Sequence, residues 1–125
     1  MKALRLYGPD DLRLDEVEKP TAPPGGLVLK IDACAICGSD LRNIKAGGSA
    51  HKMKMPAILG HEFSGTIVEL GEGVTDFEIG QKVVSSTIIP CGKCRYCLTG
   101  RQNLCVDKNA ISYIVPGAFA EYVML

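Results

Sequence analysis

The sequence has no excess of charge of either sign. Its 125 residues carry 14 Lys and Arg against 14 Asp and Glu, so the formal net charge at neutral pH is zero. Proteins that bind nucleic acid or an anionic membrane surface through electrostatics carry a basic excess. The charge balance therefore gives no reason to expect nucleic acid or membrane as a partner.

Long apolar segments are also missing. No stretch approaches the roughly 20 apolar residues that a membrane-spanning helix needs. The N-terminal residues MKALRLYGPDDLRLDE lack the apolar run and the small-residue cleavage site of a secretory signal peptide. We therefore expect a cytoplasmic protein. In that compartment thiols stay reduced, and clustered cysteines bind metal more often than they pair as disulfides.

A glycine-rich nucleotide motif is absent as well. The close glycines at 25–26, 47–48 and 71–73 do not form the G-x-G-x-x-G pattern that follows a strand in dinucleotide-binding domains. The sequence therefore predicts that residues 1–125 contain no dinucleotide site of their own.

Short apolar runs and turn residues alternate along the whole chain. With 46% hydrophobic residues, this pattern predicts one globular domain over 1–125. We expect a mainly β, barrel-like fold with one or two short helices and a zinc-binding lobe. The strand at 27–34 should place Leu27, Leu29 and Ile31 on one face and Val28 on the other. The other predicted strands are 1–6, 12–17, 63–70, 82–89 and 118–124, and the predicted helix is 39–46.

Four of the six cysteines lie in one run, PCGKCRYCLTGRQNLC. Their spacing brings four thiols within reach of one ion, and zinc takes four thiolates in the closed tetrahedral shell of a structural site. The run is polar and contains glycine, so it indicates a loop that needs a metal to hold its shape. This lobe covers 90–106, and its candidate ligands are Cys91, Cys94, Cys97 and Cys105.

Cys37, His61 and Glu62 are candidates for a second, open metal site. Cys37 lies at a strand-to-helix junction, where the helix N-terminus favours the thiolate that a metal needs. His61 and Glu62 come just before a strand. From spacing alone two interpretations stay open: a metal site, or a small buried thiol and a hydrogen-bonded turn histidine.

Four motifs occur in order along the chain. They are CGSD at 37–40, GHEFSG at 60–65, the four-cysteine lobe and GAFAEY at 117–122. With these motifs the chain resembles the N-terminal GroES-like catalytic domain of the zinc-dependent medium-chain alcohol and polyol dehydrogenases. The likeness covers essentially the whole chain, and sorbitol, threonine and sugar-alcohol dehydrogenases are the nearest subfamily.

The resemblance implies a role for each matching residue. Cys37 and His61 would be catalytic zinc ligands, and Glu62 a ligand or a close neighbour of the metal. Ser39 would hydrogen-bond the substrate oxygen and pass on its proton, although Ser is also well suited to cap a helix N-terminus. The four lobe cysteines would hold the structural zinc.

The implied activity is oxidation of a small alcohol or polyol to a ketone or aldehyde through a zinc-bound alkoxide, with NAD or NADP taking the hydride. In the family the Rossmann domain and the last zinc ligand follow this region. We therefore expect the chain to be an inactive fragment. The full-length protein would be a homo-oligomer.

Arg42 departs from the family pattern, because many members have a His there that completes the proton relay. Arg42 either lies on a solvated helix face or contacts a phosphorylated or acidic substrate. Asp40 is expected to complement the helix dipole. Cys34 is expected in the core at a strand end, and His51 in a solvated loop.

Two non-enzymatic functions compete with this interpretation. One is a GroES-like structural or binding module whose zinc is purely structural, and the other is a zinc-lobe interaction domain. Neither needs an open metal site, so the presence of Cys37, His61 and Glu62 favours the enzyme. The reductase branch of the same superfamily usually lacks both zinc sites.

Overall fold

The structure, a computed structural model, describes residues 1–49 and 53–125, so His51 lies outside the described residues. The fold is mainly β with short helices, as predicted. The helices are α1 (Gly38–Ala46), α2 (Arg95–Leu98) and the 3-10 helix η2 (Gln102–Leu104). The strands are β1 (Lys2–Gly8), β2 (Asp11–Glu16), β3 (Leu27–Ala35), β4 (Ala57–Ile58), β5 (Glu62–Leu70), β6 (Lys82–Val84), β7 (Ile88–Ile89), β8 (Asn109–Ala110) and β9 (Tyr122–Met124).

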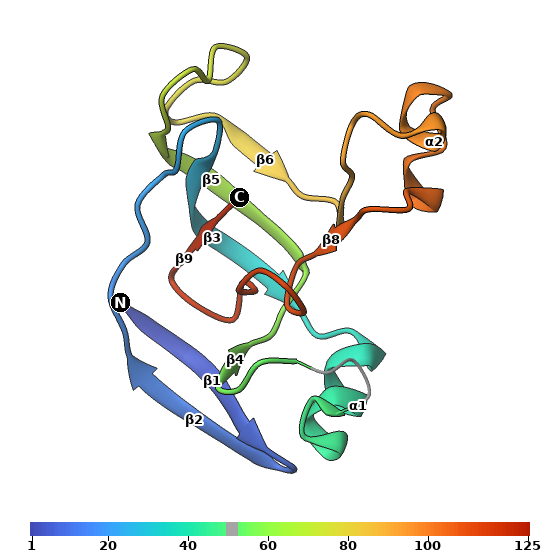
Figure 1. Ribbon diagram of the computed structural model, residues 1–125. Helices are drawn as coiled ribbons and strands as arrows, with labels where there is room; N and C mark the ends of the chain where they lie inside the picture. The colour runs from blue at the N-terminus through green and yellow to red at the C-terminus, as the bar shows by residue number, and fades with distance from the viewer. Residues whose placement is uncertain (50–52) are drawn as a thin grey trace.

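The strands form three sheets, and the segment before the C-terminal strand links the two larger ones. The sheet orders are β2-β1-β4, β6-β5-β3-β9 and β7-β8. A bridge between Ala3 and Ala120 connects the first sheet to the segment before β9, and Leu4 N donates to Phe119 O over 2.7 Å. Figure 1 shows the two larger sheets together, with the α2 lobe projecting away from them.

Two apolar clusters hold the sheets together. The larger one joins the central strands β3 and β5 to the C-terminal segment, and the smaller one joins β1 to the segment before β5. Burial of such side chains is the main favourable contribution to folding. The buried members are Leu29, Phe63, Ile67, Ile111, Ala118 and Val123 in the larger cluster and Leu6, Met53 and Leu59 in the smaller one.

Two details of the predicted strands are wrong. The predicted strand 82–89 is two strands in two sheets, because the chain leaves β5 after β6 and then pairs with β8 at the base of the lobe. Only Tyr122–Met124 of the predicted strand 118–124 is a strand. The register of β3 shifts between Val28 and Leu29, and both side chains are fully buried.

Helix α1 begins and ends close to the predicted limits of 39–46. Cys37 is its N-cap residue, and Gly47 ends it with a φ of 58°, the left-handed conformation that glycine adopts without steric cost. Among the described residues no helix has the length and apolar character needed to span a bilayer.

Candidate metal centres

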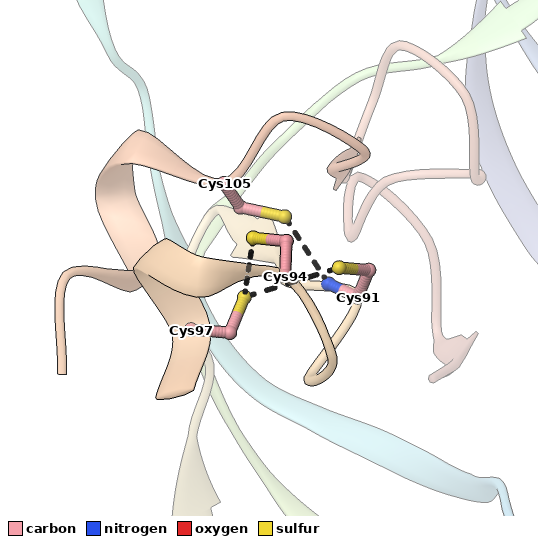
Figure 2. A group of neighbouring side chains, drawn as sticks. All are labelled: Cys91, Cys94, Cys97 and Cys105. Atoms are coloured by element: carbon pink, nitrogen blue, oxygen red, sulfur yellow. Dashed lines mark hydrogen bonds between the residues drawn. The ribbon is translucent and has the colours of Figure 1, made fainter. Parts of the chain in front are cut away.

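The four lobe cysteines converge on one point. Their sulfur atoms all lie within 4.8 Å of one another. The Sγ of Cys97 is 3.5 Å from that of Cys94 and 4.0 Å from that of Cys91, as Figure 2 shows. Zinc–sulfur bonds of about 2.3 Å at tetrahedral angles would place the sulfurs about 3.8 Å apart. The donor set therefore fits one zinc ion with small adjustments.

Backbone N–H groups prepare two of these thiols for a metal. The N–H groups of Cys97 and Val106 lower the pKa of Cys94 to about 6. The N–H of Cys91, which donates to the Cys105 sulfur over 3.3 Å, lowers the pKa of Cys105. Desolvation raises the pKa of Cys97 to about 12. Because only the thiolate binds a metal, Cys97 needs the charge of the ion itself before it loses its proton.

Cys37, His61 and Glu62 form a second group. One ligand atom from each lies within 4.8 Å of the other two. Cys37 immediately precedes α1, whereas His61 and Glu62 lie at the start of β5, which pairs with β3. The imidazole is buried, the thiol is half-buried and the carboxylate is exposed. Three candidate ligands with one open side are the arrangement of a catalytic zinc site, in contrast to the closed lobe site.

The backbone before His61 requires a glycine. Gly60 has a φ of 91°, and a Cβ built there would lie 2.6 Å from a ring carbon of Phe119 and 2.9 Å from the Cys34 sulfur. A side chain at this position would therefore displace the chain that carries His61.

Asp40 supports both halves of the open site, and the sequence analysis missed this role. It is 1% exposed, its Oδ2 accepts the N–H of Cys37 over 2.9 Å, and its Oδ1 accepts the N–H of Gly60 over 3.4 Å. The same Oδ1 lies 3.6 Å from Nδ1 of His61, which has no hydrogen bond in the described part of the chain. A carboxylate facing Nδ1 leaves Nε2 for a metal. The available signal was an acidic residue three positions after Cys37, the spacing of a capping box.

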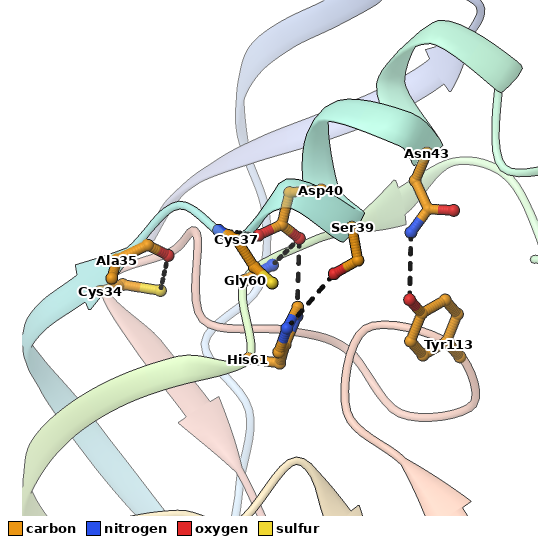
Figure 3. A network of polar contacts seen from close by, with 9 residues as sticks. All are labelled: Cys34, Ala35, Cys37, Ser39, Asp40, Asn43, Gly60, His61 and Tyr113. Carbon is orange, nitrogen blue, oxygen red and sulfur yellow. Dashed lines mark hydrogen bonds and ion pairs between the residues drawn. The ribbon is translucent and has the colours of Figure 1, made fainter.

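Ser39 lies on the Nε2 side of the histidine ring. Its Oγ is 3.4 Å from His61 Nε2, as Figure 3 shows. The alternative in which Ser39 caps the helix is wrong, because Cys37 is the N-cap residue and Ser39 is already inside the first turn. Its hydroxyl is therefore directed to the open site.

Cys34 and Arg42 belong to neither group of candidate ligands. Cys34 is half-buried near the end of β3, and its Sγ is 3.6 Å from the carbonyl of Ala35. Burial raises the pKa of the Cys34 thiol to about 11. The Cys34 thiol is therefore protonated at neutral pH, which agrees with its expected place in the core at a strand end. Arg42 is exposed on α1, and its two interpretations stay open.

A closed group of four sulfurs and an open Cys-His-Glu group on one β domain are together typical of one class of zinc protein. Residues 23–125 match the family model of the alcohol dehydrogenase GroES-like domain. The chain therefore belongs to the alcohol dehydrogenase GroES-like domain family, and the predicted fold class is confirmed.

The relatives of this chain include two kinds of dehydrogenase. It is 42% identical over 127 aligned residues to L-threonine 3-dehydrogenase from Cutibacterium acnes, covering 100% of this chain and 37% of the relative. It is 39% identical to sorbitol dehydrogenase from Halalkalibacterium halodurans, covering 99% of this chain and 36% of the relative. The chain thus spans little more than a third of these proteins.

A solved structure extends the similarity to three dimensions. The cobalt- and zinc-bound thermostable alcohol dehydrogenase from Pyrobaculum aerophilum superimposes with a TM-score of 0.91 at 35% identity. The match covers 100% of this chain and 39% of that protein. The architecture described above is therefore that of a zinc-containing alcohol dehydrogenase over its corresponding part.

Proposed function

We propose that this chain is the substrate- and zinc-binding domain of a zinc-dependent, NAD(P)-linked alcohol or polyol dehydrogenase. The observation that carries the proposal is the open group of Cys37, His61 and Glu62, with the hydroxyl of Ser39 3.4 Å from His61 Nε2. A structural module has no use for such an arrangement, because a metal that only stabilises a fold is held in a closed shell.

In this proposal the residues of the open site have separate tasks. Cys37, His61 and Glu62 would hold a zinc ion, and Asp40 would hold the His61 ring in the orientation that presents Nε2. Zinc supplies Lewis acidity, which makes the hydroxyl group of an alcohol easier to deprotonate. Ser39 would hydrogen-bond the substrate oxygen and pass on its proton, releasing its own hydroxyl proton towards solvent as it takes that of the substrate. The nucleotide that takes the hydride would bind outside residues 1–125.

The lobe has a purely structural task in the same proposal. Cys91, Cys94, Cys97 and Cys105 would hold the second zinc, with no position left for a substrate. The full-length protein would be a cytoplasmic homo-oligomer that acts on a small alcohol or polyol, and residues 1–125 alone would be inactive.

Metal analysis and activity of the full-length protein test the proposal together. We expect two zinc ions per chain and alcohol-dependent reduction of NAD or NADP. His61→Ala should leave one zinc and abolish activity, whereas His51→Ala, a change at the other histidine of residues 1–125, should preserve both. One zinc per wild-type chain and no activity would favour a structural or binding module instead.

A further inference from the structure

Asn43 is a second buried polar residue on the face of α1 that carries Ser39. Residues four apart in a helix lie on one face, with their Cβ atoms about 5–6 Å apart. Since the Ser39 hydroxyl is 3.4 Å from His61 Nε2, this face of α1 is directed to the open metal site. Figure 3 shows Asn43 and Tyr113 beside Ser39 and His61.

The hydrogen bonding of Asn43 is incomplete. The residue is 2% exposed, and its Nδ2 donates to the hydroxyl oxygen of Tyr113 over 3.3 Å. Its Oδ1 is buried without a hydrogen-bond partner within residues 1–49 and 53–125. Burying an amide oxygen without a partner costs free energy that an apolar side chain in the same place would not cost. A ligand with a hydrogen-bond donor would complete the hydrogen bonding of this amide.

Tyr113 reaches Asn43 from another part of the chain. It lies between β8 and β9, and its hydroxyl oxygen accepts the hydrogen bond from Asn43 Nδ2, which joins this segment to the helix face that carries Ser39. The amide and the phenol are both uncharged, and the amide of Asn43 has a donor end and an acceptor end, so it can pair with a hydroxyl group in either direction.

We propose that Asn43 and Tyr113 form the part of the substrate cleft that recognises a second hydroxyl group of the substrate, next to the oxygen held by Ser39. This inference rests on the proposed dehydrogenase function and specifies its substrate as a polyol. The two ends of the amide have nearly the same shape, so a rotation of the side chain presents either one to the ligand. An analogue that lacks the second hydroxyl leaves the amide unpaired, which is how hydrogen-bonding sites discriminate strongly.

A structural role for the same contact makes a different prediction. If the hydrogen bond only ties the segment around Tyr113 to α1, its loss lowers the melting temperature and reduces the activity on every substrate by one common factor. Recognition of a hydroxyl group instead changes the ratio between substrates.

The test compares butane-2,3-diol with butan-2-ol, two alcohols that differ by one hydroxyl group, as substrates of the full-length zinc-loaded protein. Asn43→Leu should lower kcat/KM for the diol roughly tenfold or more relative to butan-2-ol. Tyr113→Phe keeps the packing and removes only the hydroxyl, so it should change the ratio in the same direction by a smaller factor. Asn103→Leu, a change at an exposed asparagine in η2, is the matched control and should leave the ratio unchanged.

The outcomes separate this inference from the function on which it rests. If the wild-type protein oxidises neither alcohol with NAD or NADP, the proposed function fails. If the wild-type protein is active and both variants leave the ratio at its wild-type value, only the role of Asn43 and Tyr113 is overturned. Should Asn43→Leu fail to fold, the ratio for Tyr113→Phe decides.

Discussion

A single buried carboxylate, Asp40, links the two halves of the open site. Asp40→Ala removes the acceptor of the Cys37 N–H and the group that faces His61 Nδ1. We expect zinc affinity at the open site of the full-length protein to fall about 10–100-fold, because such partners orient the ligands. Competition with a chromogenic chelator measures this affinity. Asp76→Ala, a change at an exposed acidic residue, is the control. An affinity equal to that of the wild type would show that Asp40 has no such role.

Cys34 should react slowly with thiol reagents. Its pKa is raised from 9.0 to about 11, mainly by burial. Because the thiolate is the nucleophile, its alkylation by iodoacetamide at pH 8 should be about 100-fold slower than for an ordinary cysteine. The rate should keep rising about tenfold per pH unit beyond pH 9 and level off only near pH 11. Peptide mass spectrometry of the zinc-loaded protein follows this residue, and a plateau near pH 9 would contradict the assignment.

The candidate ligand residues could be named from the sequence because they lie in short motifs that resemble those of one family, and the structure brings them together in two groups. The role of Asp40 could not be predicted from the sequence. Its contacts form only because Gly60 and His61, which lie in another segment, come close to it, and the local sequence does not show that Asp40 is buried. Asn43 was missed for the same reason, since its partner Tyr113 lies beyond the lobe. Local patterns thus identify donor atoms but not the side chains that orient them.

At the scale of elements, the lobe should depend on its metal while the sheets do not. Neither α2 nor η2 has a buried residue, and helices this short are not stable alone. Removal of zinc by a chelator should therefore abolish hydrogen-exchange protection in 91–105. The amides of β3 and β5, whose strands carry the larger apolar cluster, should keep theirs. Equal loss of protection in β3 and β5 would show that the lobe zinc supports the whole domain.

Strand existence was easier to predict than strand pairing. The segments that became β1, β2, β3 and β5 were recognised from their apolar residues and the turns between them. The separation of β6 from β7 was not, because the apolar run 82–89 has no local mark of the point where the chain leaves one sheet and enters another. The bulge at Val28 escaped prediction because it arises from pairing with β5, a strand distant in sequence.

At the scale of the whole molecule, the two candidate sites differ in what residues 1–125 provide. The lobe offers four sulfur atoms from one stretch of chain, and two of these thiols have lowered pKa values. The open group offers three ligands from two elements, one of them an exposed carboxylate. A closed thiolate shell binds zinc far more tightly than three mixed ligands beside solvent. The chain alone should therefore hold its two metals unequally.

The isolated 125-residue chain makes this difference measurable. After saturation with zinc and dialysis against a weak chelator, we expect about one zinc per chain, and Cys94→Ser should remove it because the closed shell is broken. His61→Ala should leave that zinc in place, since the imidazole belongs to the other group.

The same preparation should show no alcohol-dependent reduction of NAD or NADP, because residues 1–125 contain no dinucleotide fingerprint. If Cys94→Ser kept its zinc and His61→Ala lost it, the assignment of the tight and weak sites would be reversed. If the isolated chain reduced the nucleotide, residues 1–125 would suffice for catalysis.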